Sequence, residues 1–88
     1  MKLLFEKKFL KDISNLNNKK IQKAIEEIII QSEQVSAVSQ LKNIKKLSGF
    51  KNAYRIRIGE YRIGILAEQE NLIFVRILHR KEVYNYFP

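Results

Sequence analysis

The amino-acid sequence predicts an α+β fold in which a helical hairpin packs on one face of an antiparallel sheet. Three observations predict this class. Two amphipathic helical patterns lie in the N-terminal part, alternating patterns typical of strands lie in the second half, and Gly59-Glu60 joins two of these strands as a hairpin turn. The expected order of elements is β-α-α-β-β-β with a short tail, and residues 1–88 are expected to form a single domain.

The N-terminal part is expected to hold one short strand and both helices. The predicted strand covers Lys2–Glu6. Apolar residues spaced three and four apart predict one helix over Lys7–Asn15 and a second over Lys19–Ser32, with Asn18 as the N-cap of the second helix. Because only the tight Asn17-Asn18 break separates the helices, we expect them to form an antiparallel hairpin.

The segments around the sheet have weaker patterns. Residues Glu33–Asn43 show no clear period and are expected to connect the helices to the sheet with a single helical turn. The short sequence Leu47-Ser48-Gly49 predicts a bend before the next strand. The chain is expected to close with a short helical turn within Lys81–Pro88.

The stretch Tyr54–Arg62 predicts a strand and turn with one apolar and one cationic face. The predicted cross-strand pairs are Ile58 with Tyr61, Arg57 with Arg62, Ile56 with Ile63, and Arg55 with Gly64. Three arginines then share one side of the sheet, the arginine face: Arg55, Arg57 and Arg62. Since like charges opposite each other destabilise a sheet, this face is predicted to hold an anion. Gly64 is expected to leave room for something to approach the backbone.

The final strand is predicted over Asn71–Arg80, and its register depends on Arg76. One register places Arg76 beside Ile63 on the core face, which would bury a charge. The preferred register places Ile73, Val75 and Ile77 beside Ile65, Ile63 and Tyr61. It puts Arg76 and Arg80 on the arginine face, with Leu72 and Phe74 at its far end. The helices are expected to cover the apolar face and leave the arginine face open to solvent.

The composition limits the possible functions. The chain has 17 Lys and Arg against 9 Asp and Glu, a net charge of +8, so we expect a nucleic-acid or acidic protein partner. It has no cysteine and one histidine, so no disulfide, metal site or cofactor is expected. No segment has the length of a membrane span or the pattern of a signal peptide, which predicts a cytoplasmic protein with no membrane partner.

The side chains of the arginine face suit cleavage of an RNA phosphodiester without a metal. Guanidinium groups can stabilise the charge that grows on the phosphate, His79 is the only imidazole available for proton transfer, and Tyr84 could donate a proton or stack on a base. The candidate catalytic residues are Arg55, Arg57, Arg62, Arg80, Tyr84 and His79. The candidate RNA-binding residues are Lys45, Lys46, Lys51 and Arg76. The alternative interpretation is a solvated basic face with a structural His79 and aromatic residues that close the core.

Three segments together resemble the RelE/ParE superfamily of toxins from bacterial and archaeal toxin–antitoxin pairs. They are Lys46-Leu47-Ser48-Gly49, the stretch from Tyr54 to Arg62, and His79-Arg80-Lys81-Glu82-Val83-Tyr84. With the predicted order of elements, the resemblance covers nearly the whole chain. It implies RelE-type activity, which is the cleavage of messenger RNA in the ribosomal A site. It also implies a cognate antitoxin that binds and neutralises the toxin in a hetero-oligomer.

The resemblance places the family's basic residues at Arg55, Arg57, Arg62 and Arg80 and its tyrosine at Tyr84. The best-known RelE-type site has lysines at the first two positions, and a lysine is its proposed general base. Arginine is a poor general base, so His79 is a hypothetical substitute for that lysine.

Two other functions stay open at this point. A ParE-like toxin would inhibit DNA gyrase on the same fold, although members of that branch usually lack the basic residues and the tyrosine of the RNA-cleaving branch. A non-catalytic RNA-binding or protein-binding module would keep the basic face without an ordered His79 or Tyr84. The fold alone does not decide among these functions.

Overall fold

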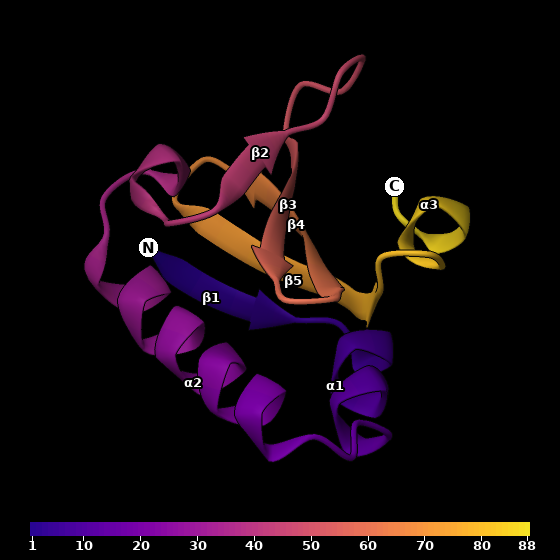
Figure 1. The fold of residues 1–88 in the computed structure, drawn as a ribbon. Helices are drawn as coiled ribbons and strands as arrows, with labels where there is room; N and C mark the ends of the chain where they lie inside the picture. The colour runs from indigo at the N-terminus through magenta and orange to yellow at the C-terminus, as the bar shows by residue number, and fades with distance from the viewer.

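A five-stranded sheet organises the computed structural model, which describes all 88 residues (Figure 1). The strands lie in the order β1-β5-β4-β3-β2. In chain order the elements are β1 (Lys2–Phe5), α1 (Lys7–Ser14), α2 (Lys19–Gln34), the 3-10 helix η1 (Val38–Gln40), β2 (Ile44–Lys46), β3 (Ala53–Ile58), β4 (Tyr61–Glu68), β5 (Asn71–His79) and α3 (Val83–Tyr86). The predicted α+β class is confirmed, and none of the helices is long and apolar enough to span a membrane.

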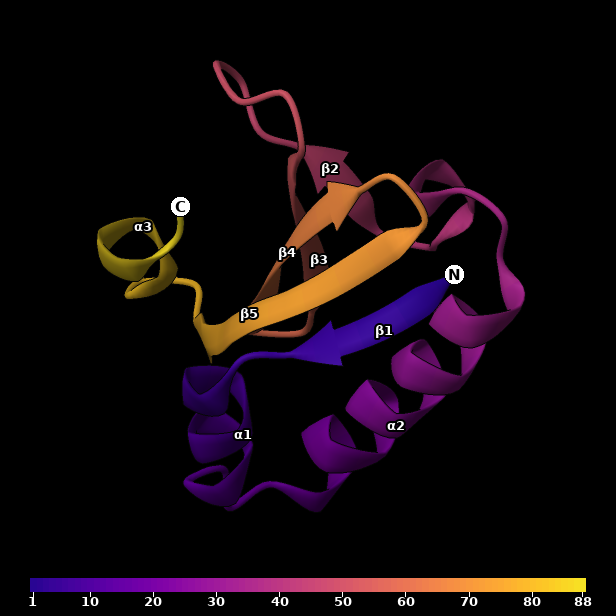
Figure 2. The same ribbon diagram turned by 180° about the vertical axis from the view of Figure 1, so that it is seen from behind.

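Helices α1 and α2 cover the apolar face of the sheet. The Asn18 side chain accepts a hydrogen bond from the Ile21 N–H at 3.1 Å, which confirms the predicted N-cap. Phe9 of α1 and Ile25 of α2 are buried in the main core beneath the sheet. The two helices splay apart from their short connection instead of pairing closely, so that α1 lies beside the end of β5 and α2 runs along β1 (Figures 1 and 2). Each helix therefore buries its apolar stripe against the sheet rather than against its partner.

Strand β1 runs parallel to β5, so the prediction of a purely antiparallel sheet was wrong at this edge. The reason lies in α1, which follows β1 directly and packs against the second half of β5. Asp12 near the end of α1 accepts hydrogen bonds from the Arg76 Nε at 2.8 Å, the Arg76 Nη2 at 3.0 Å and the Ile77 N–H at 3.0 Å. With α1 held there, β1 can lie only along the first half of β5, in the same direction.

Strand β2 was not predicted. Residues 44–46 were expected in the approach to the central hairpin, but they form an edge strand antiparallel to β3. Only Ile44 in this three-residue strand is apolar, so the segment is too short for an alternating pattern to be recognised. The pairing sets Lys45 opposite Arg55 and so adds a lysine beside the arginines. The predicted helical turn before it is confirmed as η1.

The hairpin formed by β3 and β4 has the predicted register. All four predicted pairs are present, including Arg57 opposite Arg62 and Arg55 opposite Gly64. Gly59 begins the two-residue turn with φ +55°, a conformation that side chains disfavour. The three arginines of the arginine face therefore come from paired strands, as the sequence analysis expected.

The register between β4 and β5 differs from the prediction in two ways. Ile77 lies opposite Ile63 instead of Tyr61, a shift of two residues, and β5 contains a bulge beyond this point. Gly64 pairs with Arg76 and Ile65 pairs with Phe74, so Val75 lies outside the regular pairing. The bulge turns Leu72 and Phe74 toward the helices, where both are fully buried, and not toward the arginine face as predicted. The Phe74 ring packs 5.3 Å from Phe9, centroid to centroid. Burial of this large ring favours the bulge. The regular alternation of the apolar residues 73, 75 and 77 predicted a strand without one.

The arginine face is only partly open to solvent, which corrects a second expectation. Helix α3 folds over one end of it, and Ala53, Val83 and Phe87 form a small buried cluster there. The Phe87 ring lies directly on Gly64, where an added Cβ would overlap it. The space left by Gly64 is thus filled by the protein's own C-terminal segment, and Phe87 closes a core while Tyr84 and Tyr86 stay exposed.

Replacing Gly64 with alanine is expected to force Phe87 off the sheet. Overpacking of this kind destabilises a fold by about 1–3 kcal/mol, and chemical denaturation should show that loss of free energy of unfolding. In the Phe87→Ala background the same Gly64→Ala change should have a much smaller effect, because the ring that it meets is gone. Additive effects of the two substitutions would contradict the assigned contact.

Replacing Asp12 with asparagine is expected to destabilise the junction of α1 and β5. The Asp12 and Arg76 side chains are 11% and 16% exposed, so the loss should be about 3 kcal/mol, the lower end of the range for a broken buried pair. Glu60→Gln is the matched control, because Glu60 pairs with Arg80 on the surface and such pairs contribute about 0–1 kcal/mol. Equal losses of free energy of unfolding in denaturant titrations would show that the Asp12 pair contributes no more than a surface ion pair.

Candidate functional site

Four cations and one phenol surround a hollow on the arginine face. Strand β2 contributes Lys45, β3 contributes Arg55 and Arg57, β4 contributes Arg62, and α3 contributes Tyr84. The hollow has a volume of about 370 Å³, and we call it the cationic hollow. Five of the residues that the sequence analysis selected are therefore brought together by three strands and the C-terminal helix.

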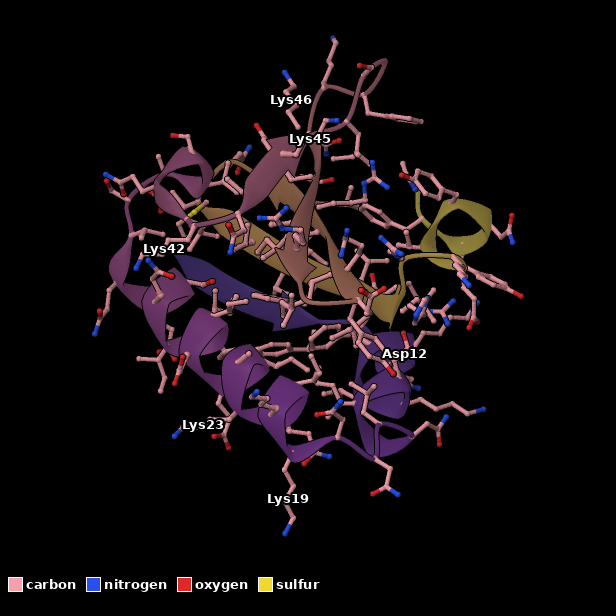
Figure 3. The ribbon with its side chains drawn as sticks, in the orientation of Figure 1. Asp12, Lys19, Lys23, Lys42, Lys45 and Lys46 are labelled. Carbon is pink, nitrogen blue, oxygen red and sulfur yellow. The ribbon has the colours of Figure 1, made fainter.

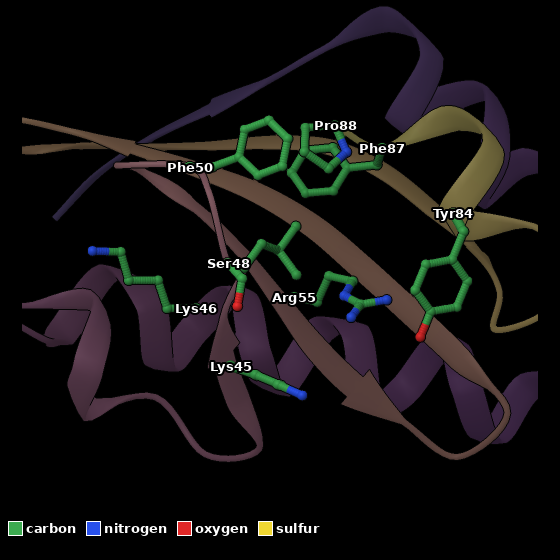
Figure 4. A pocket seen from close by; sticks show the side chains of 9 residues that line it. Lys45, Lys46, Ser48, Phe50, Arg55, Tyr84, Phe87 and Pro88 are labelled. Atoms are coloured by element: carbon green, nitrogen blue, oxygen red, sulfur yellow. The ribbon is translucent and has the colours of Figure 1, made fainter.

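The Arg55 guanidinium lies over the Tyr84 ring, with its central carbon 4.5 Å from the ring centroid. Figure 4 shows the guanidinium pointing toward this ring. Hydrogen bonding from the Arg55 side chain and the Arg55 charge lower the pKa of Tyr84 below its ordinary value, with smaller contributions from Lys45 and Arg62. Tyr84 is 71% exposed, so a phenol that loses its proton more readily than usual is accessible from solvent.

None of the three arginines of the arginine face has a carboxylate within ion-pair distance. Arg62 instead donates from Nη1 to the Gly59 and Tyr61 carbonyl oxygens, both at 2.8 Å, which fixes its side chain against the hairpin turn. Figure 3 shows that lysines also point outward from α2, as Lys19 and Lys23 do. The arginine face differs from that surface because its cations converge on one hollow, an arrangement that an anion would stabilise.

Two predicted catalytic residues lie outside the cationic hollow. His79 pairs with Tyr61 across the sheet, on the side that faces the helices, with the two ring centroids 5.7 Å apart. Its Nδ1 accepts a hydrogen bond from the Lys81 N–H at 3.2 Å. Arg80 follows β5 and places its Nε 2.9 Å from a Glu60 carboxylate oxygen. Neither side chain lines the cationic hollow that Tyr84 lines.

The four predicted RNA-binding residues also separate into different environments. Lys45 and Lys46 lie on β2 and line a second hollow beside the first, whereas Lys51 is exposed in the loop between β2 and β3. Arg76 is held by Asp12, whose hydrogen bonds raise the pKa of Arg76. Its guanidinium carbon also lies 5.2 Å from the Tyr86 ring centroid. Arg76 thus serves as a link between α1, β5 and α3.

The second hollow contains residues that the sequence analysis missed. It has a volume of about 390 Å³ and includes Ser48, Phe50 and Pro88 among its lining (Figure 4). Phe50 follows a glycine in a basic loop, and this position of an aromatic residue was the only available signal in the sequence. We call this space the aromatic hollow.

Removing the Arg55 guanidinium is expected to move the titration of Tyr84 to higher pH. In the wild type the positive charge favours the ionised phenol, so Tyr84 should ionise below the pH of an ordinary tyrosine; Arg55→Gln removes most of that preference. The ultraviolet absorbance of tyrosinate can be followed against pH, with the Tyr84→Phe variant subtracted to remove the other tyrosines. Arg80→Gln is the control, and an unchanged titration in Arg55→Gln would contradict the assigned contact.

Comparisons with known proteins agree on one family. The model of the ParE toxin of type II toxin-antitoxin system, parDE, matches residues 3–84. Toxin RelE3 of Methanocaldococcus jannaschii is 46% identical over 89 residues, and the match covers 100% of both chains.

The solved structures show the same relationship at the level of the fold. A chain of the RelB-RelE antitoxin-toxin complex from Methanococcus jannaschii aligns with a TM-score of 0.82 at 42% identity, covering 97% of this chain and 99% of that chain. The YoeB dimer from Staphylococcus aureus aligns with a TM-score of 0.73 at 19% identity, covering 91% and 97%, and shows the shared fold. The family model matches nearly the whole chain, and the archaeal relative matches all of it. The chain therefore belongs to the RelE/ParE superfamily and is a RelE-like toxin of a type II toxin–antitoxin system.

Proposed function

We propose that this toxin is a metal-independent endoribonuclease that cleaves messenger RNA in the ribosomal A site and so blocks translation. The observation that carries the proposal is the cationic hollow, where Tyr84 lies among four cations that have no carboxylate partner. Guanidinium groups bind phosphate oxygens with two parallel hydrogen bonds, so this surface suits the backbone of RNA. The hollow has no carboxylate or imidazole in its lining that could hold a cation.

The proposed reaction begins when a 2′-hydroxyl attacks the neighbouring phosphorus. The bond from phosphorus to the 5′-oxygen breaks, and the leaving oxygen takes up a proton from solvent, to which the acceptor of the 2′ proton later returns that proton. The products are a 2′,3′-cyclic phosphate and a free 5′-hydroxyl. Arg55, Arg57 and Arg62 would stabilise the charge that grows on the non-bridging oxygens. Tyr84 is the group in the hollow suited to accept the 2′ proton, because the Arg55 guanidinium lies over its ring and lowers the pKa of the phenol.

Residues outside the hollow receive smaller roles in this proposal. His79 lies on the helix-facing side of the sheet, so we assign it no part in proton transfer. Lys51 is exposed and would add positive charge along the path of the RNA, whereas Arg80 is already paired with Glu60. Lys45 and Lys46 would contact RNA from the open edge of the sheet, and Arg76 would act only through its packing.

Removing either Arg62 or Tyr84 is expected to slow cleavage on the ribosome strongly. Loss of one preorganised donor to the phosphate typically lowers the rate roughly a hundredfold, and loss of the proton acceptor in Tyr84→Phe should have at least a similar effect. The measurement is single-turnover cleavage of messenger RNA on programmed ribosomes, read by primer extension at several pH values. The wild-type rate should rise with pH as Tyr84 loses its proton, and Tyr84→Phe should lose this rise.

Two controls accompany these variants. Lys23→Ala removes an outward-pointing cation of α2, and His79→Gln removes the imidazole on the opposite side of the sheet. Both should cleave at close to the wild-type rate. Full-rate cleavage by Arg62→Ala and Tyr84→Phe would refute the proposed site, whatever the controls showed.

We further propose that an acidic antitoxin binds and neutralises this toxin in the cytoplasm. A relative 42% identical in sequence is part of a RelB-RelE antitoxin-toxin complex, and the net charge of +8 favours a partner of opposite charge. A disordered acidic segment that folds on binding would suit this surface.

The second candidate function is inhibition of DNA gyrase. One observation favours it, because the matching family model is that of the ParE toxin. The convergence of Arg55, Arg57, Arg62 and Tyr84 on one hollow favours RNA instead, because the three guanidinium groups suit the phosphates of an RNA backbone. A purified toxin that inhibits gyrase supercoiling and leaves ribosome-bound messenger RNA intact would establish the alternative.

A further inference from the structure

The aromatic hollow has no role in the phosphate chemistry proposed above. It lies between the loop that joins β2 to β3 and the C-terminal residues, and its apolar lining includes Phe50, Phe87 and Pro88 (Figure 4). Lys45, Arg55 and Tyr84 line both this hollow and the cationic hollow. The two spaces are therefore neighbours that meet at the same three side chains.

A tight turn holds Phe50 in place at this hollow. The Phe50 N–H donates to the Leu47 carbonyl oxygen at 3.4 Å, and Gly49 between them has φ +83°, as the third residue of a type II turn requires. The Leu47 N–H donates to the Ala53 carbonyl oxygen at 2.9 Å, which closes the base of the loop. The turn thus fixes the backbone of Phe50, whose side chain is 48% exposed and belongs to neither buried core cluster.

Charge around the aromatic hollow narrows the kind of ligand that it fits. Lys45, Lys46 and Arg55 line it, and no carboxylate does. A suitable ligand therefore combines a flat apolar group with a nearby negative charge. A nucleotide has this combination, because its base has an apolar face and its phosphate is an anion.

We propose that the aromatic hollow is a nucleobase site, which binds the base next to the phosphate held in the cationic hollow. This inference rests on the proposed endoribonuclease function. The face of the base would stack on the Phe50 ring, with Pro88 on the same apolar wall. The Ser48 hydroxyl, also in the lining, could donate to or accept from the edge of the base. Stacking of this kind tolerates every base, whereas a contact from Ser48 would favour some bases over others.

The test compares the wild type with Phe50→Ala, Phe50→Tyr and Leu10→Ala on programmed ribosomes. Leu10→Ala is the matched control, since Leu10 is an exposed apolar residue of α1. Each protein acts on two kinds of messenger RNA. One kind is unmodified. The other carries a single abasic ribose, in one version on the 5′ side of the cleavage position and in a second version on the 3′ side. The toxin concentration that gives half-maximal single-turnover cleavage is measured separately from the maximal rate.

The expected result is specific to the base. Phe50→Ala should raise the half-maximal concentration roughly tenfold on the unmodified RNA with little change in the maximal rate, and Phe50→Tyr should restore it. In one of the two abasic versions, the missing base is the one that the hollow binds. On that RNA the wild type and Phe50→Ala should have the same half-maximal concentration. Leu10→Ala should match the wild type on both RNAs.

Three other results would overturn the inference in different ways. If Phe50→Ala cleaves both RNAs as the wild type does, Phe50 contacts no base, although the endoribonuclease function stands. If cleavage is unchanged but Phe50→Ala no longer retains its antitoxin during co-purification, the hollow binds an antitoxin side chain instead. If the wild type cleaves neither RNA, the endoribonuclease function fails, and the nucleobase site fails with it.

Discussion

The packing of Phe87 against Gly64 is the contact on which the candidate site depends. It anchors the C-terminal segment to the middle of the sheet, because the missing Cβ at residue 64 leaves a place for the ring. Helix α3 is only four residues long and could not hold its position by its own backbone hydrogen bonds. Its placement sets the Tyr84 ring beside Arg55 and makes the C-terminal residues a wall of the aromatic hollow. One glycine in a strand thus determines where the Tyr84 phenol lies.

The five arginines of the chain separate into two groups with different electrostatic roles. Arg76 and Arg80 are paired with Asp12 and Glu60; the Arg76 pair is largely buried and joins α1 to β5, whereas the Arg80 pair lies on the surface. The other three remain without carboxylate partners on neighbouring positions of β3 and β4. Their mutual repulsion opposes folding, and the apolar face beneath them offsets it through burial. The sheet therefore holds three guanidinium groups that lack a carboxylate partner within the chain and that an external anion would stabilise.

The sequence could predict the features that local patterns control. Strict alternation and a glycine turn determined the β3–β4 register, and the Asn18 side chain marked the start of α2, so the positions of Arg55, Arg57 and Arg62 followed directly. Features set by tertiary packing could not be predicted. The bulge at Val75 serves the burial of Phe74, and the folding of α3 onto the sheet depends on a contact 23 residues away in sequence, between Gly64 and Phe87. His79 was expected at the edge of the arginine face, but it pairs with Tyr61 on the side that faces the helices, which the alternation continued from Ile77 implies.

The bulge in β5 has a consequence for the cooperativity of the molecule. Before the bulge, Leu72 and Phe74 belong to the core beneath the helices, while Val75 and Leu78 contact the cluster that surrounds Phe87 on the opposite face. A single strand therefore supplies side chains to both apolar layers, and neither layer can separate from the sheet without disturbing the same backbone. Helix α3 is accordingly part of one folding unit with the helices on the far side, rather than an appendage that opens independently. The two faces are expected to lose their structure together, in a single transition.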